Sequence, residues 1–330
     1  MKWNSEEADS NDMVDRRGAS GRSSGMGGIG GAGLAAVLGS LLGGRRRKGG
    51  VVGLLIVVVV VVVVPMLMGG GGFDVSTAGI NDLPGLDQGR QLPGQGNSSD
   101  VALPAAPDPN PELTTFANVV ITDTNNVWQK QFDASNRSYD RAKMVLFTGG
   151  VESACGRASS AMGPFYCPAD RQVYIDLGFF DELATRFGAA GDFAQAYVIA
   201  HEVGHHVQNE LGINAQVRKL EQQDPSAADG PKGLSVRTEL QADCLAGVWA
   251  HSRYERGQAD PSRRLDDGDI DEALRAASGV GDDAIQKAAT GRVNPDSFTH
   301  GKSSQRARWF KQGYNSGDSS TCDTFSTDDL

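Results

Sequence analysis

The hydrophobic and polar positions divide the chain near residue 112. Beyond this point apolar residues recur at helical spacing, and the pattern predicts helices at about residues 112–133, 178–188, 192–211, 234–256, 269–277, 281–289 and 303–313. A strand is expected at 143–147, and residues 172–177 alternate between apolar and polar side chains, as a half-buried strand does. Residues 112–330 are numerous enough to bury a core of their own. We therefore expect one α+β domain, mainly helical, with a small antiparallel sheet.

The first third of the chain follows a different pattern. Residues 1–50 are polar, then rich in glycine, and end in a basic cluster, so no packed core is expected there; the cluster consists of Arg45, Arg46, Arg47 and Lys48. In residues 51–68 every position is apolar, glycine or proline, which reaches the lower bound for a membrane-spanning helix of roughly 20 residues. Glycine, proline, asparagine and serine recur in residues 69–111, which predicts a flexible linker. This order predicts a transmembrane helix followed by a tethered domain.

The basic cluster before residues 51–68 sets the expected orientation. Cytoplasmic flanks of membrane spans collect lysine and arginine. A single span in the cytoplasmic (inner) membrane is therefore predicted, with a cytoplasmic N-terminus and a periplasmic or extracellular domain. A cleaved signal peptide is the alternative, but the polar lead of about 48 residues is much longer than the charged start of a signal peptide. A buried core segment is the weaker alternative, because nothing beside it could cover it.

Composition and charge narrow the range of functions. The formal net charge is −10 and the isoelectric point is near 5.0, whereas proteins that bind nucleic acid need a basic face for the phosphates. We therefore expect no nucleic-acid partner. All four cysteines follow residues 51–68, on the predicted exported side, where disulfides persist.

A metal-binding motif lies inside the helix predicted at 192–211. His201, Glu202 and His205 form an HExxH pattern. Residues four apart lie on one helix face, about 6 Å along the axis, so both imidazoles can bind a single ion. Glu202 points about 100° away from His201, where it can act as a general base without being a ligand. Chance occurrence is the alternative, but the chain has only five histidines, and the apolar helix around these polar groups favours a metal.

A catalytic zinc site needs a third protein ligand and one open position. The metzincin spacing would place glycine and histidine where Gln208 and Leu211 stand, so that class is excluded. Glu239 is the better candidate, and Asp243, one helical turn later, is placed to accept the second ring N–H of either ligand histidine. The alternative for both acids is a solvated helix face.

Other residues compete for these roles. Glu210 and Glu221 are weaker ligand candidates, because Glu210 lies on the far side of its helix and Glu221 falls in a stretch predicted as a loop. His206 is expected to pack or to face solvent, and His251 lies too far along its helix from the third ligand. His300 precedes a helix and could either donate a hydrogen bond to the developing oxyanion or be structural.

Four segments of the chain resemble a known family. These are HEVGHHVQN at 201–209, ELQADCLAGVWA at 239–250, CGRASSAMGPFYCPAD at 155–170 and FTHGKSSQRARWFKQGY at 298–314. They are similar to the bacterial family described as putative neutral zinc metallopeptidases, and the likeness covers residues 112–330 together with one N-terminal anchor. The resemblance implies a zincin-like domain that acts on protein or peptide substrates.

A more distant similarity is to gluzincins such as thermolysin and to membrane peptidases of the HtpX type. Their third ligand is a glutamate with an aspartate one turn later, which Glu239 and Asp243 match. The membrane peptidases also have a Thr-His pair and a following arginine, similar to Thr299, His300 and Arg306. The same likeness implies that the strand at 172–177 is an edge that pairs with an extended substrate.

Together these patterns predict a membrane-anchored zinc endopeptidase. Zn²⁺ would be held by His201, His205 and Glu239, with Glu202 as the general base and His300 as a candidate oxyanion donor. A catalytically weak binding or scaffold protein at the membrane is the alternative, which the intact Glu202 disfavours. A non-proteolytic zinc hydrolase is a third possibility, which the predicted substrate strand disfavours.

The four cysteines allow three pairings. We favour Cys155–Cys167 with Cys244–Cys322, since the second bond would tie the polar tail to the helix that carries the third ligand.

Overall fold

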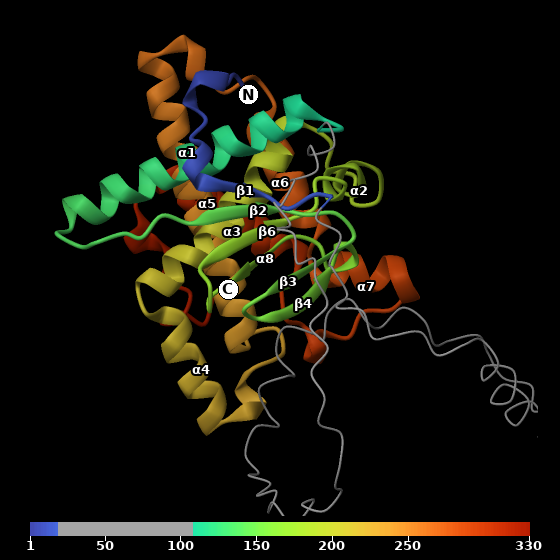
Figure 1. Ribbon diagram of the computed structural model, residues 1–330. Helices are drawn as coiled ribbons and strands as arrows, with labels where there is room; N and C mark the ends of the chain where they lie inside the picture. The colour runs from blue at the N-terminus through green and yellow to red at the C-terminus, as the bar shows by residue number, and fades with distance from the viewer. Residues whose placement is uncertain (19–107) are drawn as a thin grey trace, which may run out of the picture.

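The computed structural model describes residues 1–18 and 108–330 (Figure 1). The predicted membrane span at 51–68 and most of the predicted linker at 69–111 lie outside the described residues. Among the residues that are described, no helix is long and apolar enough to cross a membrane. The α+β class is confirmed, because helices predominate and two small sheets accompany them.

Every long helix that the sequence pattern predicts is present to within a few residues. Within the described ranges the α-helices are α1 (Pro111–Ala134), α2 (Phe179–Thr185), α3 (Asp192–Glu210), α4 (Ile213–Gln223), α5 (Leu234–Ala259), α6 (Asp269–Gly279), α7 (Asp282–Thr290) and α8 (Ser303–Ser316). The sequence analysis missed α4, because Gly212 has the features of a helix stop. Gly212 does end α3, but its left-handed conformation (φ 78°) lets the next helix start at once. Glu221 therefore lies on α4 and not in a loop.

The larger sheet has the strand order β1-β2-β6-β5. Its strands β1 (Met13–Asp15), β2 (Lys143–Leu146) and β6 (Gln172–Ile175) run parallel, and β5 (Phe165–Cys167) is antiparallel to β6. The strands β3 (Gly150–Ser153) and β4 (Gly156–Ser159) form a separate antiparallel hairpin. The predicted antiparallel sheet is therefore wrong for the larger sheet. The chain between β2 and β6 forms the hairpin and then β5, so β6 returns beside β2 in the parallel direction.

Strand β6 is an inner strand with both of its faces covered. Val173 and Ile175 belong to the main core, whereas Tyr174 packs in a second cluster that includes Val151 of the hairpin. The three β6 side chains are at most 1% exposed. The segment at 172–177 is therefore neither half-buried nor an edge, and its predicted pairing with substrate is wrong. Among the described strands, β5 forms the free edge on this side of the sheet.

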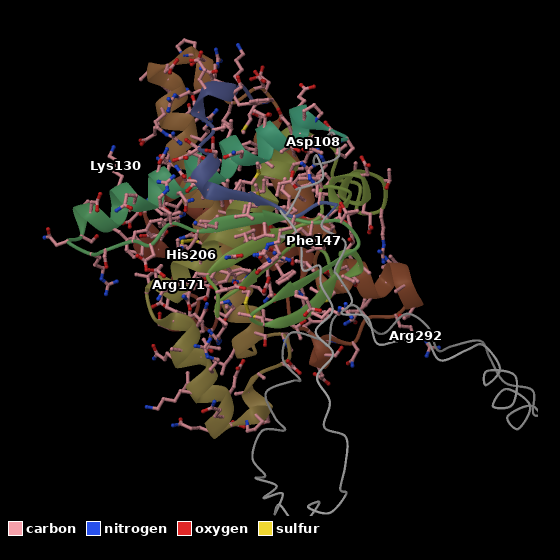
Figure 2. All side chains as sticks on the ribbon, in the orientation of Figure 1. Asp108, Lys130, Phe147, Arg171, His206 and Arg292 are labelled. Carbon is pink, nitrogen blue, oxygen red and sulfur yellow. A yellow bond between two sulfur atoms is a disulfide. The ribbon has the colours of Figure 1, made fainter. Side chains whose placement is uncertain are left out.

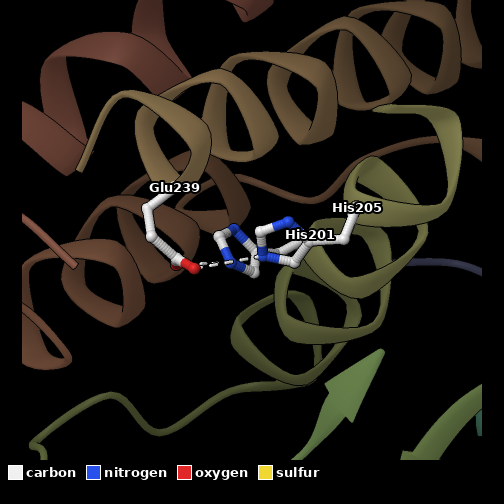
Figure 3. Close-up of side chains that lie close together, drawn as sticks. All are labelled: His201, His205 and Glu239. Carbon is white, nitrogen blue, oxygen red and sulfur yellow. Dashed lines mark hydrogen bonds and ion pairs between the residues drawn. The ribbon is translucent and has the colours of Figure 1, made fainter. Parts of the chain in front are cut away.

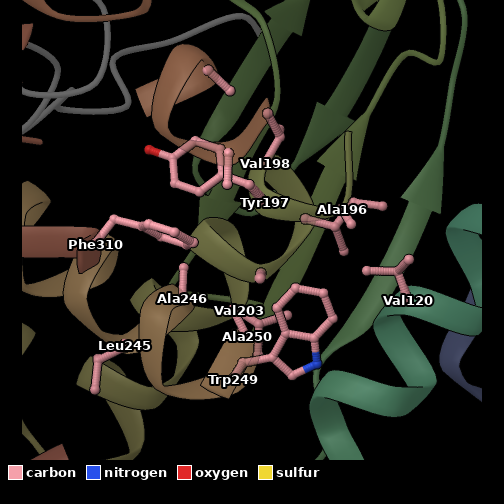
Figure 4. Close-up of a cluster of buried hydrophobic side chains, with 14 of the residues drawn as sticks. Val120, Ala196, Tyr197, Val198, Val203, Leu245, Ala246, Trp249, Ala250 and Phe310 are labelled. Atoms are coloured by element: carbon pink, nitrogen blue, oxygen red, sulfur yellow. The ribbon is translucent and has the colours of Figure 1, made fainter. Parts of the chain in front are cut away.

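The main core is centred on α3, which packs against α1, α5 and α6. Figure 4 shows Tyr197 of α3 beside Phe310 of α8, with the two rings edge to face and 5.5 Å apart. On the other side of the cluster, Trp249 of α5 stacks on Phe193 of α3 at 5.7 Å. These large buried aromatic contacts fix α3, the helix that carries the HExxH motif, against its neighbours.

Glycines allow the closest helix contacts. A Cβ on Gly204, inside the HExxH motif, would lie 2.9 Å from the backbone oxygen of Ala242 on α5. A Cβ on Gly313 of α8 would lie 1.9 Å from the carbonyl oxygen of Cys244, also on α5. Such distances leave no room for any side chain, so these two glycines set how near α3 and α8 come to α5.

The first eighteen residues pack on the domain, and Figure 1 shows them (blue) beside α1 and at the edge of the sheet. Trp3 lies edge-on to Phe116 of α1 at 5.6 Å, and β1 pairs with β2. Arg17 binds Asp15 and Asp108 at 2.6 and 2.8 Å, so residues 17 and 108 meet at one point of the surface. The lack of packed structure predicted for residues 1–50 is therefore wrong for residues 1–18.

Both disulfides of the favoured pairing are present. Cys155–Cys167 joins the turn between β3 and β4 to the edge strand β5, and Cys244–Cys322 joins α5 to the short 3₁₀ helix Ser319–Cys322. None of the four cysteines is free. The second bond ties the tail to the helix that carries Glu239, as the sequence analysis expects.

Candidate metal centre

Two neighbouring helices bring three predicted ligand residues together (Figure 3). His201 and His205 project from one face of α3, and Glu239 reaches them from α5. His201 Nε2 lies 3.2 Å from Glu239 Oε2, and His205 Nε2 lies 3.3 Å from Glu239 Oε1. The same three residues form a group whose candidate ligand atoms all lie within 4.8 Å of one another. The sequence spacing therefore identifies a real spatial cluster.

The separations within this cluster fit a zinc ion. Zinc binds imidazole nitrogen and carboxylate oxygen at about 2.0–2.2 Å in tetrahedral geometry, which places neighbouring ligand atoms about 3.3–3.5 Å apart. The two nitrogen–oxygen distances of 3.2 and 3.3 Å are close to this spacing. Three protein ligands also leave the fourth position open, as a catalytic site requires.

The charges of the cluster favour a cation between these groups. Burial would lower the pKa of His201, but the charge and hydrogen bond of Asp243 and the hydrogen bond of Glu239 raise that pKa to about 9. Burial would raise the pKa of Glu239, but His205 and His201 hold that pKa well below its usual range. Positive charge is thus stabilised where a metal would sit.

Asp243 holds His201 from behind. His201 Nδ1 lies 2.8 Å from Asp243 Oδ1, so Nδ1–H donates to the carboxylate and Nε2 faces Glu239, with Arg306 Nη2 3.3 Å from Nε2. Tyr197 donates to the same carboxylate at 2.5 Å, and Arg306 Nε donates to its other oxygen at 2.8 Å. Asp243 was predicted to lie behind one of the two ligand histidines, and in the structure that histidine is His201. Tyr197 was not predicted, because nothing local in the sequence links it to the motif.

His205 has a different partner, which the sequence analysis missed. Its Nδ1 lies 2.9 Å from Gln208 Oε1, and Gln208 is completely buried. The signal was present, because a glutamine three residues after a ligand lies on the same helix face. In the sequence analysis Gln208 serves only to exclude the metzincin spacing.

Glu202 lies between the two histidines in the chain and is only 8% exposed. Burial is the largest cause of the raised pKa of its carboxyl group, and the negative charge of Glu239 adds to the effect. A carboxylate with a raised pKa is a stronger base than an exposed one, which suits proton transfer near neutral pH.

His300 is oriented by a buried carboxylate. The backbone N–H groups of Thr299, His300 and Gly301 donate to Asp282 Oδ2 at 2.8, 2.7 and 2.9 Å, and His300 Nδ1 lies 3.2 Å from Asp282 Oδ1. Burial would lower the pKa of His300, but Asp282 and the charge of Glu239 raise it. The imidazole side chain is 38% exposed, and its Nε2 is left for another partner.

The weaker candidates lie away from the cluster. Glu210 accepts from the backbone N–H of Asp140 at 3.5 Å, and Glu221 lies on α4. His251 bonds to the carbonyl of Tyr314 at 2.6 Å. None of these three side chains belongs to the group of metal-ligating atoms.

His206, labelled in Figure 2, joins the motif helix to the edge strand. It is fully buried, with Nδ1 3.0 Å from the hydroxyl of Tyr166 on β5 and Nε2 2.5 Å from the carbonyl oxygen of Asp140. A carbonyl only accepts, so Nε2–H donates and the Tyr166 hydroxyl donates to Nδ1. Burial lowers the pKa of His206 to about 4, which keeps the ring neutral. His206, the residue after the candidate ligand His205, therefore ties β5 to α3.

Comparisons with known proteins agree with this geometry. The family model described as "Putative neutral zinc metallopeptidase" matches residues 1–325. The uncharacterized protein YpfJ of Escherichia coli K12 is 48% identical over 245 residues, which cover 74% of this chain and 80% of that protein. The uncharacterized protein Rv2575 of Mycobacterium tuberculosis H37Rv is 50% identical over 197 residues, which cover 58% of this chain and 65% of that protein. No solved structure matches.

Proposed function

Because the chain belongs to the family described as "Putative neutral zinc metallopeptidase", we propose that it is a zinc-dependent endopeptidase that cleaves protein or peptide substrates. The observation that carries the proposal is the cluster of His201, His205 and Glu239 at zinc-like spacing, next to the buried Glu202. Binding a metal does not need this fourth group. Hydrolysis does, because a water must lose a proton as it attacks.

His201, His205 and Glu239 would hold the ion. When bound, zinc supplies a Lewis acid for the substrate carbonyl and lowers the pKa of water. Glu202 accepts the proton of the attacking water and returns it to the leaving amine as the C–N bond breaks, and its raised pKa suits both transfers. Asp243 keeps His201 in the tautomer that presents Nε2.

His300 is proposed to stabilise the oxyanion that forms on the substrate. His300 Nδ1 lies 3.2 Å from Asp282 Oδ1 and 3.0 Å from the Thr299 hydroxyl. With Nδ1–H donating to Asp282, a hydrogen bond from this residue to substrate comes from Nε2–H of the protonated ring. The raised pKa of His300 supports that protonated form. A positioned cationic donor stabilises developing negative charge in a site that excludes water.

Strand β5 is the proposed substrate edge, in place of the segment at 172–177. Its outer side has no partner among the described strands, so an extended peptide can add main chain to main chain there. The Tyr166–His206 bond fixes β5 on α3, and the Cys155–Cys167 disulfide fixes its end. These contacts fix the edge strand on the helix that carries His201 and His205.

The purified full chain is expected to cleave an unfolded protein such as casein. Treatment with a strong zinc chelator should reduce cleavage to background, and added zinc should restore it, because the three ligands supply no Lewis acid without the ion. Product fragments are measured by mass spectrometry. Cleavage that resists complete removal of zinc would contradict the proposal. A zinc-loaded chain that cleaves no peptide library would favour the scaffold alternative.

We propose that residues 51–68 attach the chain to a membrane, on the evidence of the sequence alone. A single crossing there would put residues 1–18 and the domain on opposite sides, whereas they are packed together. A molecule in which residues 51–68 cross the membrane once cannot also have residues 1–18 packed on the domain. We therefore propose that residues 1–18 lie on the same side of the membrane as the domain. The two disulfides support an oxidising compartment on that side.

Thiol labelling tests this orientation. Ser10 and Ser326 are both exposed, and the native cysteines are paired, so Ser10→Cys and Ser326→Cys each add one reactive thiol. A membrane-impermeant maleimide applied to intact cells is expected to label both variants equally. Labelling of Ser326→Cys in intact cells, with Ser10→Cys labelled only after permeabilisation, would restore the single-span orientation and show that residues 1–18 do not dock in the cell.

A further inference from the structure

His205 starts a chain of hydrogen bonds that ends at the disulfide-bonded tail. Its Nδ1 donates to Gln208 Oε1 at 2.9 Å, because an amide oxygen only accepts. Gln208 Nε2 then donates to Gln241 Oε1 at 3.1 Å, and Gln241 Nε2 donates to the carbonyl oxygen of Cys322 at 3.0 Å. In all three hydrogen bonds the donor lies on the His205 side and the acceptor on the Cys322 side, so each bond polarises the next.

The surroundings leave Gln208 a single orientation. Its Nε2 also donates to the backbone oxygen of Thr238 at 2.7 Å, and a carbonyl cannot donate in return. The amide oxygen must therefore face His205. Gln208 is 0% exposed and Gln241 is 8% exposed, so water has little access to replace either partner. With Gln208 fixed, His205 carries its proton on Nδ1 and presents the free electron pair of Nε2 toward Glu239.

The last acceptor in this series of hydrogen bonds, the Cys322 carbonyl, belongs to a residue that is held by a disulfide. Cys322 lies in the tail and is bonded to Cys244, the residue after Asp243 on α5, with a sequence separation of 78 residues. The Cys322 carbonyl that accepts from Gln241 is thereby fixed on the helix that also carries Glu239. The two imidazoles thus differ in their partners. The buried carboxylate of Asp243 binds His201 Nδ1. His205 Nδ1 is bound by a series of neutral groups, here called the relay, which consists of the Gln208 amide, the Gln241 amide and the Cys322 carbonyl.

We propose that Gln208 and Gln241 are positioning residues of the metal site, and that the Cys244–Cys322 disulfide sets zinc affinity through them. Reduction of this bond by an external dithiol, which is itself oxidised to a disulfide, leaves two thiols, releases the Cys322 carbonyl and frees the Gln241 amide to turn. Gln208 then keeps only its bond to the Thr238 carbonyl and is held less firmly. His205 gains easier access to the other tautomer, in which Nε2 carries the proton and cannot bind a metal. The inference rests on the proposed zinc site and adds a dependence on the redox state of its compartment.

Gln208→Leu tests the relay at its first member. Zinc affinity, measured by competition with a chromophoric chelator, is expected to fall about 10–100-fold, and the absorption spectrum of bound Co²⁺ should change because His205 is no longer held. Gln241→Leu should produce a smaller loss, since Gln208 keeps its bond to Thr238. It also serves as the test if Gln208→Leu does not fold.

The matched control is Asn125→Leu on α1. Asn125 is also a fully buried amide with three hydrogen bonds, to the Tyr139 hydroxyl and to the backbone N–H and carbonyl of Ala142. Its loss should lower the melting temperature and leave both zinc affinity and the Co²⁺ spectrum unchanged. Equal losses of affinity in Asn125→Leu and Gln208→Leu would overturn the relay and indicate general loosening.

The disulfide is tested by comparing two pairs of substitutions. Cys244→Ser with Cys322→Ser is expected to weaken zinc binding about tenfold, whereas Cys155→Ser with Cys167→Ser should leave zinc affinity unchanged, because that bond contacts no member of the relay. Unchanged affinity in the first pair would overturn the role of the disulfide. A wild-type chain that binds no zinc at all would instead overturn the proposed function, so the two failures are distinguishable.

Discussion

Replacing Glu202 with glutamine is expected to lower kcat/KM for peptide hydrolysis by about 10²–10⁴-fold, the usual contribution of a general base. Glutamine has nearly the same shape but cannot accept the proton of the attacking water. Zinc content should stay at one ion per chain, because Glu202 is absent from the group of ligand atoms. Hydrolysis and zinc content are measured on the same preparation, so that loss of activity is separated from loss of metal.

Glu210→Gln is the matched control for this experiment. Glu210 is the last residue of the same helix and does not belong to the group of ligand atoms. Its partners are Arg171 and the backbone of Asp140. Its replacement should leave kcat/KM within a few-fold of the native value. Retained hydrolysis in Glu202→Gln, or an equal loss in both variants, would contradict the assignment of the base.

The ligand cluster could be predicted from the sequence because its signals are local. His201 and His205 are one helical turn apart, and Glu239 and Asp243 repeat that spacing on the second helix. Helical geometry alone then places each pair on one face. The contact between the two helices was the part that the local spacing did not predict. Gly204 allows this contact because it has no side chain to keep α5 away.

Asp243 was predicted behind a ligand, and the position of Gln208 one turn after His205 was a usable signal, but the other contacts behind the ligands could not be predicted in the same way. Gln208 and Gln241 are 33 residues apart, and Gln241 and Cys322 are 81 residues apart. An amide in a helix has many uses, and its partner is fixed only when the chain folds. The same holds for Tyr197 and for the contact of Arg306 with Asp243, which depend on the packing of three helices. The family resemblance points to Arg306 but gives it no partner.

The short strands and the structure of the N-terminal segment were not predicted, for two further reasons. Strands β3 and β5 have four and three residues, too few for a period of two to be recognised. Residues 1–18 are mostly polar, and their order depends on distant partners, such as Asp12 with Arg141 and the carbonyl of Lys2 with Arg253. Composition alone therefore predicts disorder where long-range ion pairs and hydrogen bonds give structure.

Replacing Glu239 with alanine is expected to abolish stoichiometric zinc binding and, with it, peptide hydrolysis. The carboxylate lies 3.2 and 3.3 Å from the two imidazoles and is the only acid of the cluster, so its loss leaves two ligands from one helix. The loss of affinity should exceed the about 10–100-fold effect of removing a residue behind a ligand. Zinc content after dialysis is the direct measurement.

Thermal unfolding gives an independent measurement of the same loss. A ligand at 100 times its Kd stabilises the folded state by about 2.7 kcal/mol, so zinc should raise the melting temperature of the native chain. In Glu239→Ala that increase should disappear, whereas Glu221→Ala on α4 should keep it. If Glu239→Ala still binds one zinc and is stabilised by it, the ion is not held between α3 and α5, and the proposed site is wrong.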